Sequence, residues 1–164
     1  MTMPDLIKSR IMDEASLQKN LHLWRFKNKK IVFTNGCFDL LHLGHVDYLS
    51  KAADLGDILI IGINSDESVR HLKGPNRPIN DQVCRSTVLA ALHFVEAIFI
   101  FKEETPYELI KIIQPDVLVK GGDYEPANIV GYDIVKAKGG QIITIDLVPN
   151  YSSTLIEQKI KSTR

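Results

Sequence analysis

The chain has 164 residues, of which 45% are hydrophobic, and its 20 Lys and Arg residues balance its 20 Asp and Glu residues. This length suits one domain with its own core, and the balanced charge offers neither a basic surface for nucleic acid nor an acidic tail. No apolar stretch reaches the roughly 20 residues that cross a bilayer, and the N-terminus lacks the apolar core of a signal peptide, so we expect a cytoplasmic protein without nucleic acid or membrane as a partner.

Residues 1–28 differ in pattern from the remainder of the chain. Leu17, Leu21, Leu23 and Trp24 lie among polar residues, a pattern typical of an amphipathic helix. We predict a helical arm over residues 1–28 that packs on the domain or on a second subunit, with the domain itself over residues 29–164.

Short apolar, β-branched segments alternate with helical patterns along the rest of the chain. The predicted strands cover 31–33, 57–63, 95–101, 116–120 and 141–147. The predicted helices cover 44–55, 65–72, 81–92, 105–113, 127–138 and 153–162. This alternation predicts an α/β fold, a Rossmann-like doubly wound five-stranded parallel sheet with helices on both faces. Ligands of such sheets bind beyond the carboxyl ends of the strands, at the switch point of the strand order.

The segment TNGCFDLLHLGH, residues 34–45, comes directly after the first strand and leads into a helix. His42 and His45 lie three residues apart where that helix begins, and Gly44 between them leaves room for a ligand near the backbone. A loop of this kind offers free N–H groups and the positive end of a helix dipole to a phosphate. Asp39 is expected to cap the turn. Capping or surface histidines and half of a metal site remain alternatives, although no Cys or Glu stands at zinc spacing beside the pair.

Two other phosphate-binding patterns are missing from the chain. The turn after the first strand has no GxGxxG, which disfavours a dinucleotide-dependent oxidoreductase, and no GxxxxGK[ST] loop supports P-loop phosphotransfer.

The HxGH core, residues 42–45, within GCFDLLHLGH resembles the nucleotidyltransferases of the cytidylyltransferase type, which join a nucleotide to a phosphorylated small molecule and release pyrophosphate. Further segments, at 64–80, 101–106, 118–124 and 151–160, are similar in order and spacing to one subgroup. That subgroup is the D-glycero-β-D-manno-heptose 1-phosphate adenylyltransferases, which are often fused behind a sugar kinase. The resemblance covers residues 29 to 160.

The resemblance assigns roles to individual residues. It implies that His42 and His45 hold the triphosphate and stabilise the transition state, and that Lys73 neutralises phosphate charge. The implied nucleotide-binding residues are Thr34, Asn35, Gly36, Phe38, Gly44, Arg85, Lys120, Gly122, Asp123, Ser152, Ser153 and Thr154. The candidates for contact with the acceptor are Asp39, Asp66 and Arg77. A surface position for Lys73 and a salt bridge for Arg85 are the plainer alternatives.

One position departs from the wider superfamily. The SSTxxR motif of that superfamily ends in arginine, whereas this chain has Glu157 there. The departure argues against a pantothenate-type or nicotinamide-type enzyme, because sugar-phosphate and glycerol-phosphate relatives also lack that arginine. Lys159 in the next turn is either a substitute cation or a surface residue, and we favour the surface role.

The expected activity is transfer of AMP from ATP to D-glycero-D-manno-heptose 1-phosphate, giving ADP-heptose and pyrophosphate for cell-surface polysaccharide. Mg²⁺ is expected to arrive with the triphosphate, without dedicated protein ligands. We expect a homodimer and, because 164 residues leave no room for a kinase, a separate sugar kinase. The alternatives are a glycerol-3-phosphate-type cytidylyltransferase using CTP and a catalytically silent nucleotide-binding module.

Overall fold

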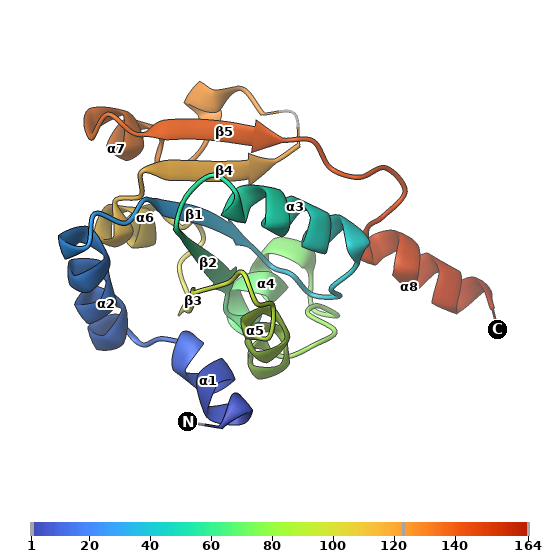
Figure 1. Cartoon of the computed structure of the whole chain (residues 1–164). Helices are drawn as coiled ribbons and strands as arrows, with labels where there is room; N and C mark the ends of the chain where they lie inside the picture. The colour runs from blue at the N-terminus through green and yellow to red at the C-terminus, as the bar shows by residue number, and fades with distance from the viewer. Residues whose placement is uncertain (1, 123, 164) are drawn as a thin grey trace.

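The computed structural model describes residues 2–122 and 124–163 and is built on one sheet of parallel strands (Figure 1). The strands are β1 (Ile31–Gly36), β2 (Ile58–Asn64), β3 (Ala97–Phe101), β4 (Val117–Gly121) and β5 (Gln141–Ile145). They lie in the order β3-β2-β1-β4-β5, and every pairing is parallel. The predicted five-stranded Rossmann-like sheet is confirmed. Its order reverses between β1 and β4, which pair at Val32 and Val117.

The described ranges also contain eight α-helices and a short 3₁₀ helix, which precede, connect or follow the strands. They are α1 (Met3–Arg10), α2 (Glu14–Phe26), α3 (Leu43–Ala53), α4 (Asp66–Lys73), α5 (Gln82–Ala90), α6 (Tyr107–Ile113), α7 (Tyr132–Ala137), α8 (Ser153–Ser162) and η1 (Pro126–Asn128). Side-chain caps begin several of them: the Ser65, Asp81 and Ser152 side chains accept bonds from backbone N–H groups of α4, α5 and α8. Across residues 2–122 and 124–163, no helix combines the length and the apolar character that a membrane span requires.

The helix predicted over 127–138 is shorter than expected. Gly131 has a φ of 87°, a left-handed conformation, and stands as the N-cap of α7. Because a left-handed residue cannot continue a right-handed helix, the segment divides into η1 and α7.

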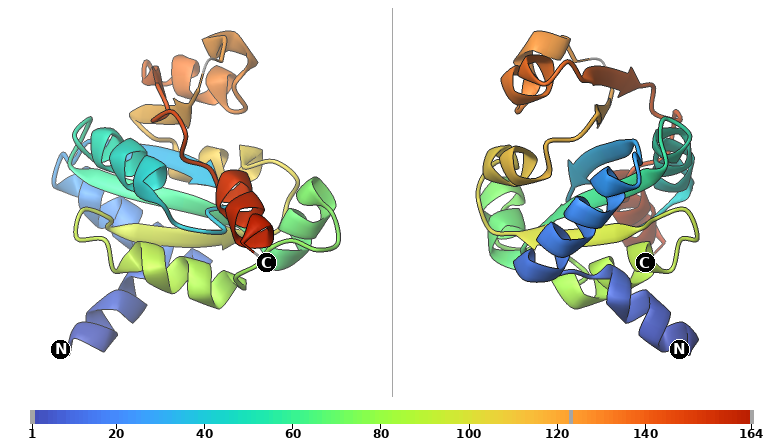
Figure 2. Two further views of the ribbon diagram at one scale, coloured as in Figure 1. Left: turned by 90° about the vertical axis from the view of Figure 1, so that its right-hand side faces the viewer. Right: turned by 60° about the vertical axis from the view of Figure 1, so that its left-hand side comes forward.

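Helices cover both faces of the sheet (Figure 2). Along β1, Ile31 and Phe33 belong to one buried cluster with residues of α2, α6 and α7, while Val32 belongs to a second cluster with residues of α3 and α5. Both faces of the central strands are therefore buried, which explains why β2 is a continuous apolar run.

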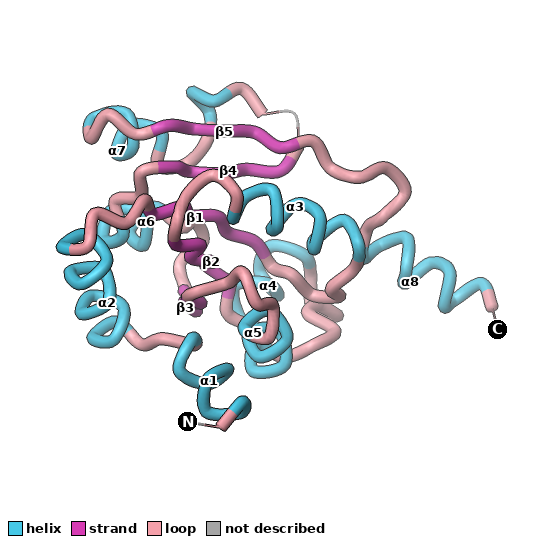
Figure 3. The backbone as a smooth tube through the Cα atoms, in the orientation of Figure 1, coloured by secondary structure: helices cyan, strands magenta, loops and turns pink. Residues whose placement is uncertain are grey.

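The N-terminal segment forms two helices, not one continuous arm (Figure 3). Between them, Ile11 pairs with Ile98 of β3, and the Met12 N–H donates to the Ile98 carbonyl at 2.9 Å. Leu17 and Leu21 of α2 are fully buried in the first cluster. The segment therefore packs on the sheet and contributes to the domain core.

Substitution of Leu17 tests this packing. Leu17→Ala should lower the free energy of unfolding by about 2–5 kcal/mol, because it leaves a cavity in a close-packed core. Leu23→Ala on the same helix is the matched control, since Leu23 is 45% exposed. Urea unfolding followed by circular dichroism measures both, and equal losses in the two variants would contradict the assignment of α2 to the core.

Candidate active site

The largest group of predicted site residues surrounds a cavity at the carboxyl ends of β1 and β4, where the strand order reverses. The cavity has a volume of about 370 Å³. It is lined by Asn35, Gly36, Cys37, Phe38, Asp39, His45, Tyr48, Lys73, Lys120, Gly121, Leu147 and Ser153. The cavity is thus formed by segments that are far apart in the chain: the loop after β1, the end of α4, β4 and the start of α8.

A second cavity of about 240 Å³ adjoins the first and shares His45, Lys73, Leu147 and Ser153 with it. It lies between the HxGH segment and the start of α8. Its other lining residues are His42, Gly44, Val148, Tyr151, Ser152 and Thr154. The N-terminus of α8 has free backbone N–H groups and hydroxyls beside it, which suits an anion.

Both histidines line the second cavity, and His45 also lines the first. Their rings are stacked with centroids 3.8 Å apart, and Phe38 packs edge-on against His45 at 5.2 Å. His42 is the N-cap of α3 but makes no side-chain capping bond. Nδ1 of His42 and Nδ1 of His45 are both buried without a hydrogen-bond partner in the described part of the chain. A buried polar atom left unpaired costs free energy, so a ligand that supplied partners would be stabilised here.

Burial also fixes the charge of this pair. The pKa of His45 is lowered to about 4, mainly by burial and to a smaller extent by His42 and Lys73, against an opposing effect of the Leu40 backbone. Burial lowers the pKa of His42 as well. Near neutral pH both rings are therefore neutral, and each can offer an N–H donor without the cost of two adjacent positive charges.

Gly44 makes the stacked arrangement possible. A Cβ at this position would lie 3.1 Å from the His42 ring and 3.3 Å from Cβ of Tyr151. The glycine therefore lets the His42 ring and the segment before α8 approach the first turn of α3.

Two lysines place positive charge around the cavities. Lys73, at the end of α4, is exposed and lines both of them. Lys120, at the end of β4, has its Nζ 3.5 Å from Oδ1 of Asn35. Burial lowers the pKa of Lys120, so an incoming anion would offset the unfavourable desolvation of its charge.

Tyr48 is a site residue that sequence reasoning missed. Its hydroxyl lies 2.6 Å from Oγ1 of Thr34, and burial raises the pKa of Tyr48 to about 12. Thr34 is fully buried and lines neither cavity, and its hydroxyl contacts that of Tyr48, so its predicted contact with the nucleotide stays a prediction. The available signal was the spacing, since Tyr48 lies three residues after His45 on the same face of α3.

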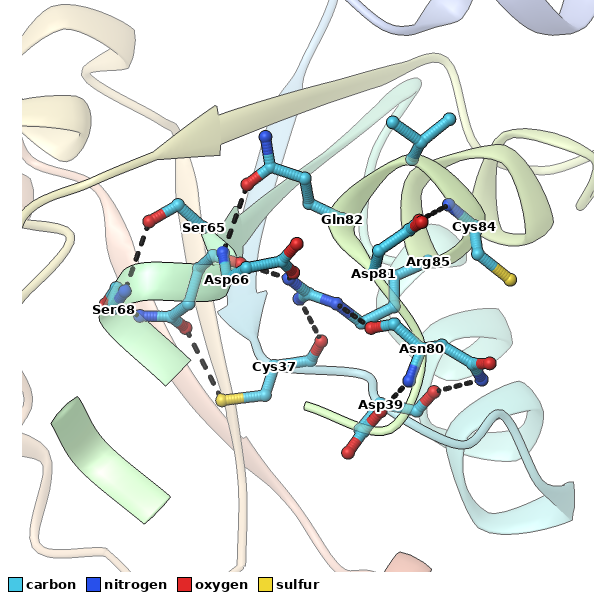
Figure 4. A network of polar contacts seen from close by, with 12 residues as sticks. Cys37, Asp39, Ser65, Asp66, Ser68, Asn80, Asp81, Gln82, Cys84 and Arg85 are labelled. Carbon is cyan, nitrogen blue, oxygen red and sulfur yellow. Dashed lines mark hydrogen bonds and ion pairs between the residues drawn. The ribbon is translucent and has the colours of Figure 1, made fainter. Parts of the chain in front are cut away.

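Arg85 lies inside the protein (Figure 4). Its guanidinium donates to the carbonyls of Cys37 at 2.7 Å, Asn64 at 2.8 Å and Asn80 at 3.1 Å, and to the Asp66 carboxylate at 2.8 Å. The side chain is 0% exposed and lines neither cavity. Its donors hold three segments of the chain together, as in the salt-bridge alternative, and the predicted contact of Arg85 with the nucleotide stays a prediction. Asp66 likewise lies outside both cavities, where it pairs with Arg85.

Asp39 organises the neighbouring loop. Its carboxylate accepts bonds of 2.9 Å from the backbone N–H groups of Ile79 and Asn80 and from Nη1 of Arg77. Burial alone would raise the pKa of Asp39, but the two N–H groups and the guanidinium outweigh it and lower the pKa. Arg77 also binds Glu157 of α8. The two predicted acceptor-binding residues Asp39 and Arg77 are thus bound to each other.

The remaining predicted site residues lie near the same carboxyl edge of the sheet. Asn35, Gly36, Phe38 and Lys120 line the first cavity, and Ser152 and Thr154 line the second. Gly122 has a φ of 98° and comes directly after Gly121 at the cavity wall. Asp123 lies outside the described residues.

Comparison with known proteins identifies the family. Residues 33–164 match the family described as Cytidylyltransferase-like. This chain belongs to the cytidylyltransferase-like family. The resemblance seen in the HxGH segment is thereby confirmed. Membership of this family, together with the similarity to individual relatives, supports a nucleotidyltransferase.

Two curated relatives carry the name "Bifunctional protein HldE". The one from Wolinella succinogenes is 51% identical over 156 residues, covering 95% of this chain and 32% of the relative. The one from Nitratiruptor is 54% identical over 146 residues, covering 89% of this chain and 30% of the relative. The chain therefore spans about a third of the length of these relatives.

Solved structures agree with the fold. A "lipopolysaccharide core biosynthesis protein" from Thermoplasma volcanium is 25% identical with a TM-score of 0.60, covering 76% of this chain and 99% of that one. Pantoate-beta-alanine ligase from Francisella tularensis is 20% identical with a TM-score of 0.56, covering 92% of this chain and 76% of that one. The second likeness concerns the fold alone.

Removal of the buried guanidinium should destabilise the protein strongly. Arg85→Met leaves Asp66 and three carbonyls without their donor, so the free energy of unfolding should fall by about 3–5 kcal/mol. Arg70→Met, at an exposed position of α4, is the matched control and should change it by less than about 0.5 kcal/mol. Urea denaturation tests both, and a normal stability of Arg85→Met would refute the structural role.

The lowered pKa of His45 predicts a pH dependence of stability. The unfolded chain binds a proton at this residue near pH 6.5, whereas the folded protein binds it only near pH 4. Between these values the unfolded state holds more protons, so stability falls as the pH drops through this window. The decrease in unfolding free energy from pH 7 to pH 5 should be smaller in His45→Asn than in the wild type. His22→Asn, at an exposed position of α2, should match the wild type, and a wild-type decrease in His45→Asn would contradict the burial of a neutral ring.

Proposed function

We propose that this protein transfers AMP from ATP to D-glycero-D-manno-heptose 1-phosphate, giving ADP-heptose and pyrophosphate for cell-surface polysaccharide. The observation that carries the proposal is the pair of stacked, neutral histidines that line the second cavity and whose buried Nδ1 atoms have no hydrogen-bond partner in the part of the chain that the structure describes. The similarity to a lipopolysaccharide core biosynthesis protein supports a sugar-phosphate acceptor in cell-surface polysaccharide synthesis. The segments at 64–80 and 118–124, which resemble the heptose subgroup, support it as well.

The proposed reaction is an in-line displacement. An oxygen of the sugar phosphate attacks the α-phosphorus of ATP, the new P–O bond forms as the bond to the β-phosphate oxygen breaks, and pyrophosphate leaves with the electron pair. A phosphate monoester has its second pKa near 6 and is largely ionised at neutral pH, so the attack needs no strong general base. Positioning and charge stabilisation therefore supply most of the acceleration.

The residues divide this work between the two cavities. His42 and His45 donate to the phosphate oxygens on which negative charge increases. The start of α8, with Ser152, Ser153 and Thr154, receives the β- and γ-phosphates, and Lys73 lies where it neutralises charge in both cavities. Loss of one donor to the transition state costs about 3 kcal/mol, or roughly a hundredfold in rate.

Mg²⁺ belongs to this proposal as the partner of the triphosphate, where it would neutralise phosphate charge. The described residues hold no group of three His, Cys, Asp or Glu side chains that could bind a metal. We propose that phosphate oxygens and water are the ligands of the ion, because Mg²⁺ loses its hydration shell reluctantly.

The proposal extends to the setting of the enzyme. We place the reaction in the cytoplasm, propose a homodimer, and expect a kinase to supply the sugar 1-phosphate, because the acceptor must already carry a phosphate when it enters.

Pyrophosphate release tests the proposed function. The protein is assayed with Mg²⁺, with ATP, CTP or GTP, and with heptose 1-phosphates of both anomers or glycerol 3-phosphate. We expect turnover with ATP and a heptose 1-phosphate, a loss of about a hundredfold or more in His45→Ala, and wild-type rates in the exposed control His22→Ala.

Other outcomes would replace the proposal. Turnover confined to CTP and glycerol 3-phosphate would show a cytidylyltransferase of alcohol phosphates. Triphosphate binding without turnover of any acceptor would favour a nucleotide-binding module, and an active His45→Ala would contradict the assigned chemistry.

A further inference from the structure

Helix α8 carries half of the proposed triphosphate site but has little apolar attachment to the domain. No residue of α8 is buried, and Leu155 and Ile160 are 46% and 62% exposed. The helix extends away from the sheet and ends in the C-terminal residues (Figures 1 and 2). Hydrophobic burial therefore contributes little to its orientation.

Polar contacts connect α8 to the domain at two points. Oγ of Ser153 donates to the Leu40 carbonyl at 3.3 Å, and the Glu157 carboxylate accepts from the Arg77 guanidinium. Among the hydrogen bonds within residues 2–122 and 124–163, these two join α8 side chains to other elements. The Ser153 bond lies at the start of the helix and Glu157 lies one turn further on, so the pair defines both the position and the direction of α8.

Arg77 is itself held in place. Its side chain is 13% exposed, and Nη1 donates at 2.9 Å to Asp39, whose carboxylate is 1% exposed and also accepts the N–H groups of Ile79 and Asn80. The bond to Asp39 and the nearby Glu157 raise the pKa of Arg77 despite its partial burial. Because the guanidinium is already fixed by Asp39, the bond from its Nη2 to Glu157 costs little side-chain conformational entropy.

We propose that Arg77 and Glu157 are positioning residues that dock α8 onto the HxGH loop and so place Ser152, Ser153 and Thr154 opposite the two histidines. We call Asp39, Arg77 and Glu157 the Arg77 bridge. One end of the bridge lies three residues before His42, and the other lies three residues after Thr154. The kinetic part of this inference rests on the proposed function, whereas the docking of α8 does not.

The bridge also accounts for the departure at residue 157. The resemblance places an arginine at this position of the SSTxxR motif, where Glu157 stands instead. The negative charge of a glutamate would repel a triphosphate. Here the Glu157 carboxylate pairs instead with the guanidinium of Arg77, which lies in the loop after α4. Arg77 lies four residues after Lys73, so the same contact connects the loop that carries Lys73 to α8.

Amide hydrogen exchange of the free protein tests the docking. Glu157→Gln keeps the shape of the side chain and removes its charge. Lys161→Met is the matched control, because Lys161 is the other partner of Glu157 and lies on the exposed side of α8. Amides of α8 should exchange about five- to tenfold faster in Glu157→Gln than in Lys161→Met, in line with the loss of a partly buried, fixed ion pair. Equal exchange in the two variants would overturn the proposal.

Kinetics of the same variants test the consequence for the site. Glu157→Gln should raise KM for ATP about five- to tenfold with kcat changed less than twofold, and Lys161→Met should leave both at wild-type values. The double variant Arg77→Gln/Glu157→Gln should bind ATP no more weakly than Arg77→Gln alone, because partners of one contact are not additive. Additive losses, or an unchanged KM in Glu157→Gln, would overturn the positioning role.

The outcomes separate this proposal from the proposed function. If no acceptor supports turnover in the wild type, the proposed function fails, but α8 exchange and the affinity for a non-hydrolysable ATP analogue still report on the bridge. If the wild type turns over, but α8 amide exchange and KM for ATP are unchanged in Glu157→Gln, the proposed positioning role of the bridge is wrong while the proposed function stands.

Discussion

The arrangement at the carboxyl edge of the sheet depends on one buried cation, the guanidinium of Arg85. A charge removed from water is tolerated only when its hydrogen bonds are satisfied. Arg85 satisfies them with carbonyls from the loop after β1, the end of β2 and the segment before α5, and with the Asp66 carboxylate. Three separate loops are thereby fixed to one another, and Cys37, one of its acceptors, lies within the segment that leads to the histidines.

The buried carboxylate of Asp39 extends this framework toward the ligand cavities. It draws the loop after α4 against the HxGH segment and orients Arg77 toward α8. Both supports hold the loop after β1, from which the chain continues to the histidines. The two rings are stacked there, and their Nδ1 atoms have no hydrogen-bond partner among the described residues. Pre-formed donors of this kind need little reorganisation when negative charge develops beside them.

Much of the fold could be predicted from sequence because β-branched runs separated by helical patterns admit few arrangements. The strands and the HxGH loop could be located from such local signals. The division of the N-terminal segment at Ile11 and the left-handed Gly131 were missed, because both depend on tertiary contacts or on a backbone angle. The sequence left two roles open for Arg85 for a similar reason: it shows that a guanidinium is present, but the direction of the side chain depends on which loops surround it. Tyr48 was overlooked because an aromatic residue in a helix is most often part of the core.

The central claim is that the Nδ1 atoms of His42 and His45, which have no hydrogen-bond partner among residues 2–122 and 124–163, receive a triphosphate. The most direct measurement is ¹⁵N NMR of labelled histidines during titration with Mg²⁺ and a non-hydrolysable ATP analogue, with the exposed His22 as an internal reference. The account predicts large shifts of the Nδ1 resonances of His42 and His45 on binding and none at His22. Saturable nucleotide binding that left both Nδ1 resonances unchanged would contradict it.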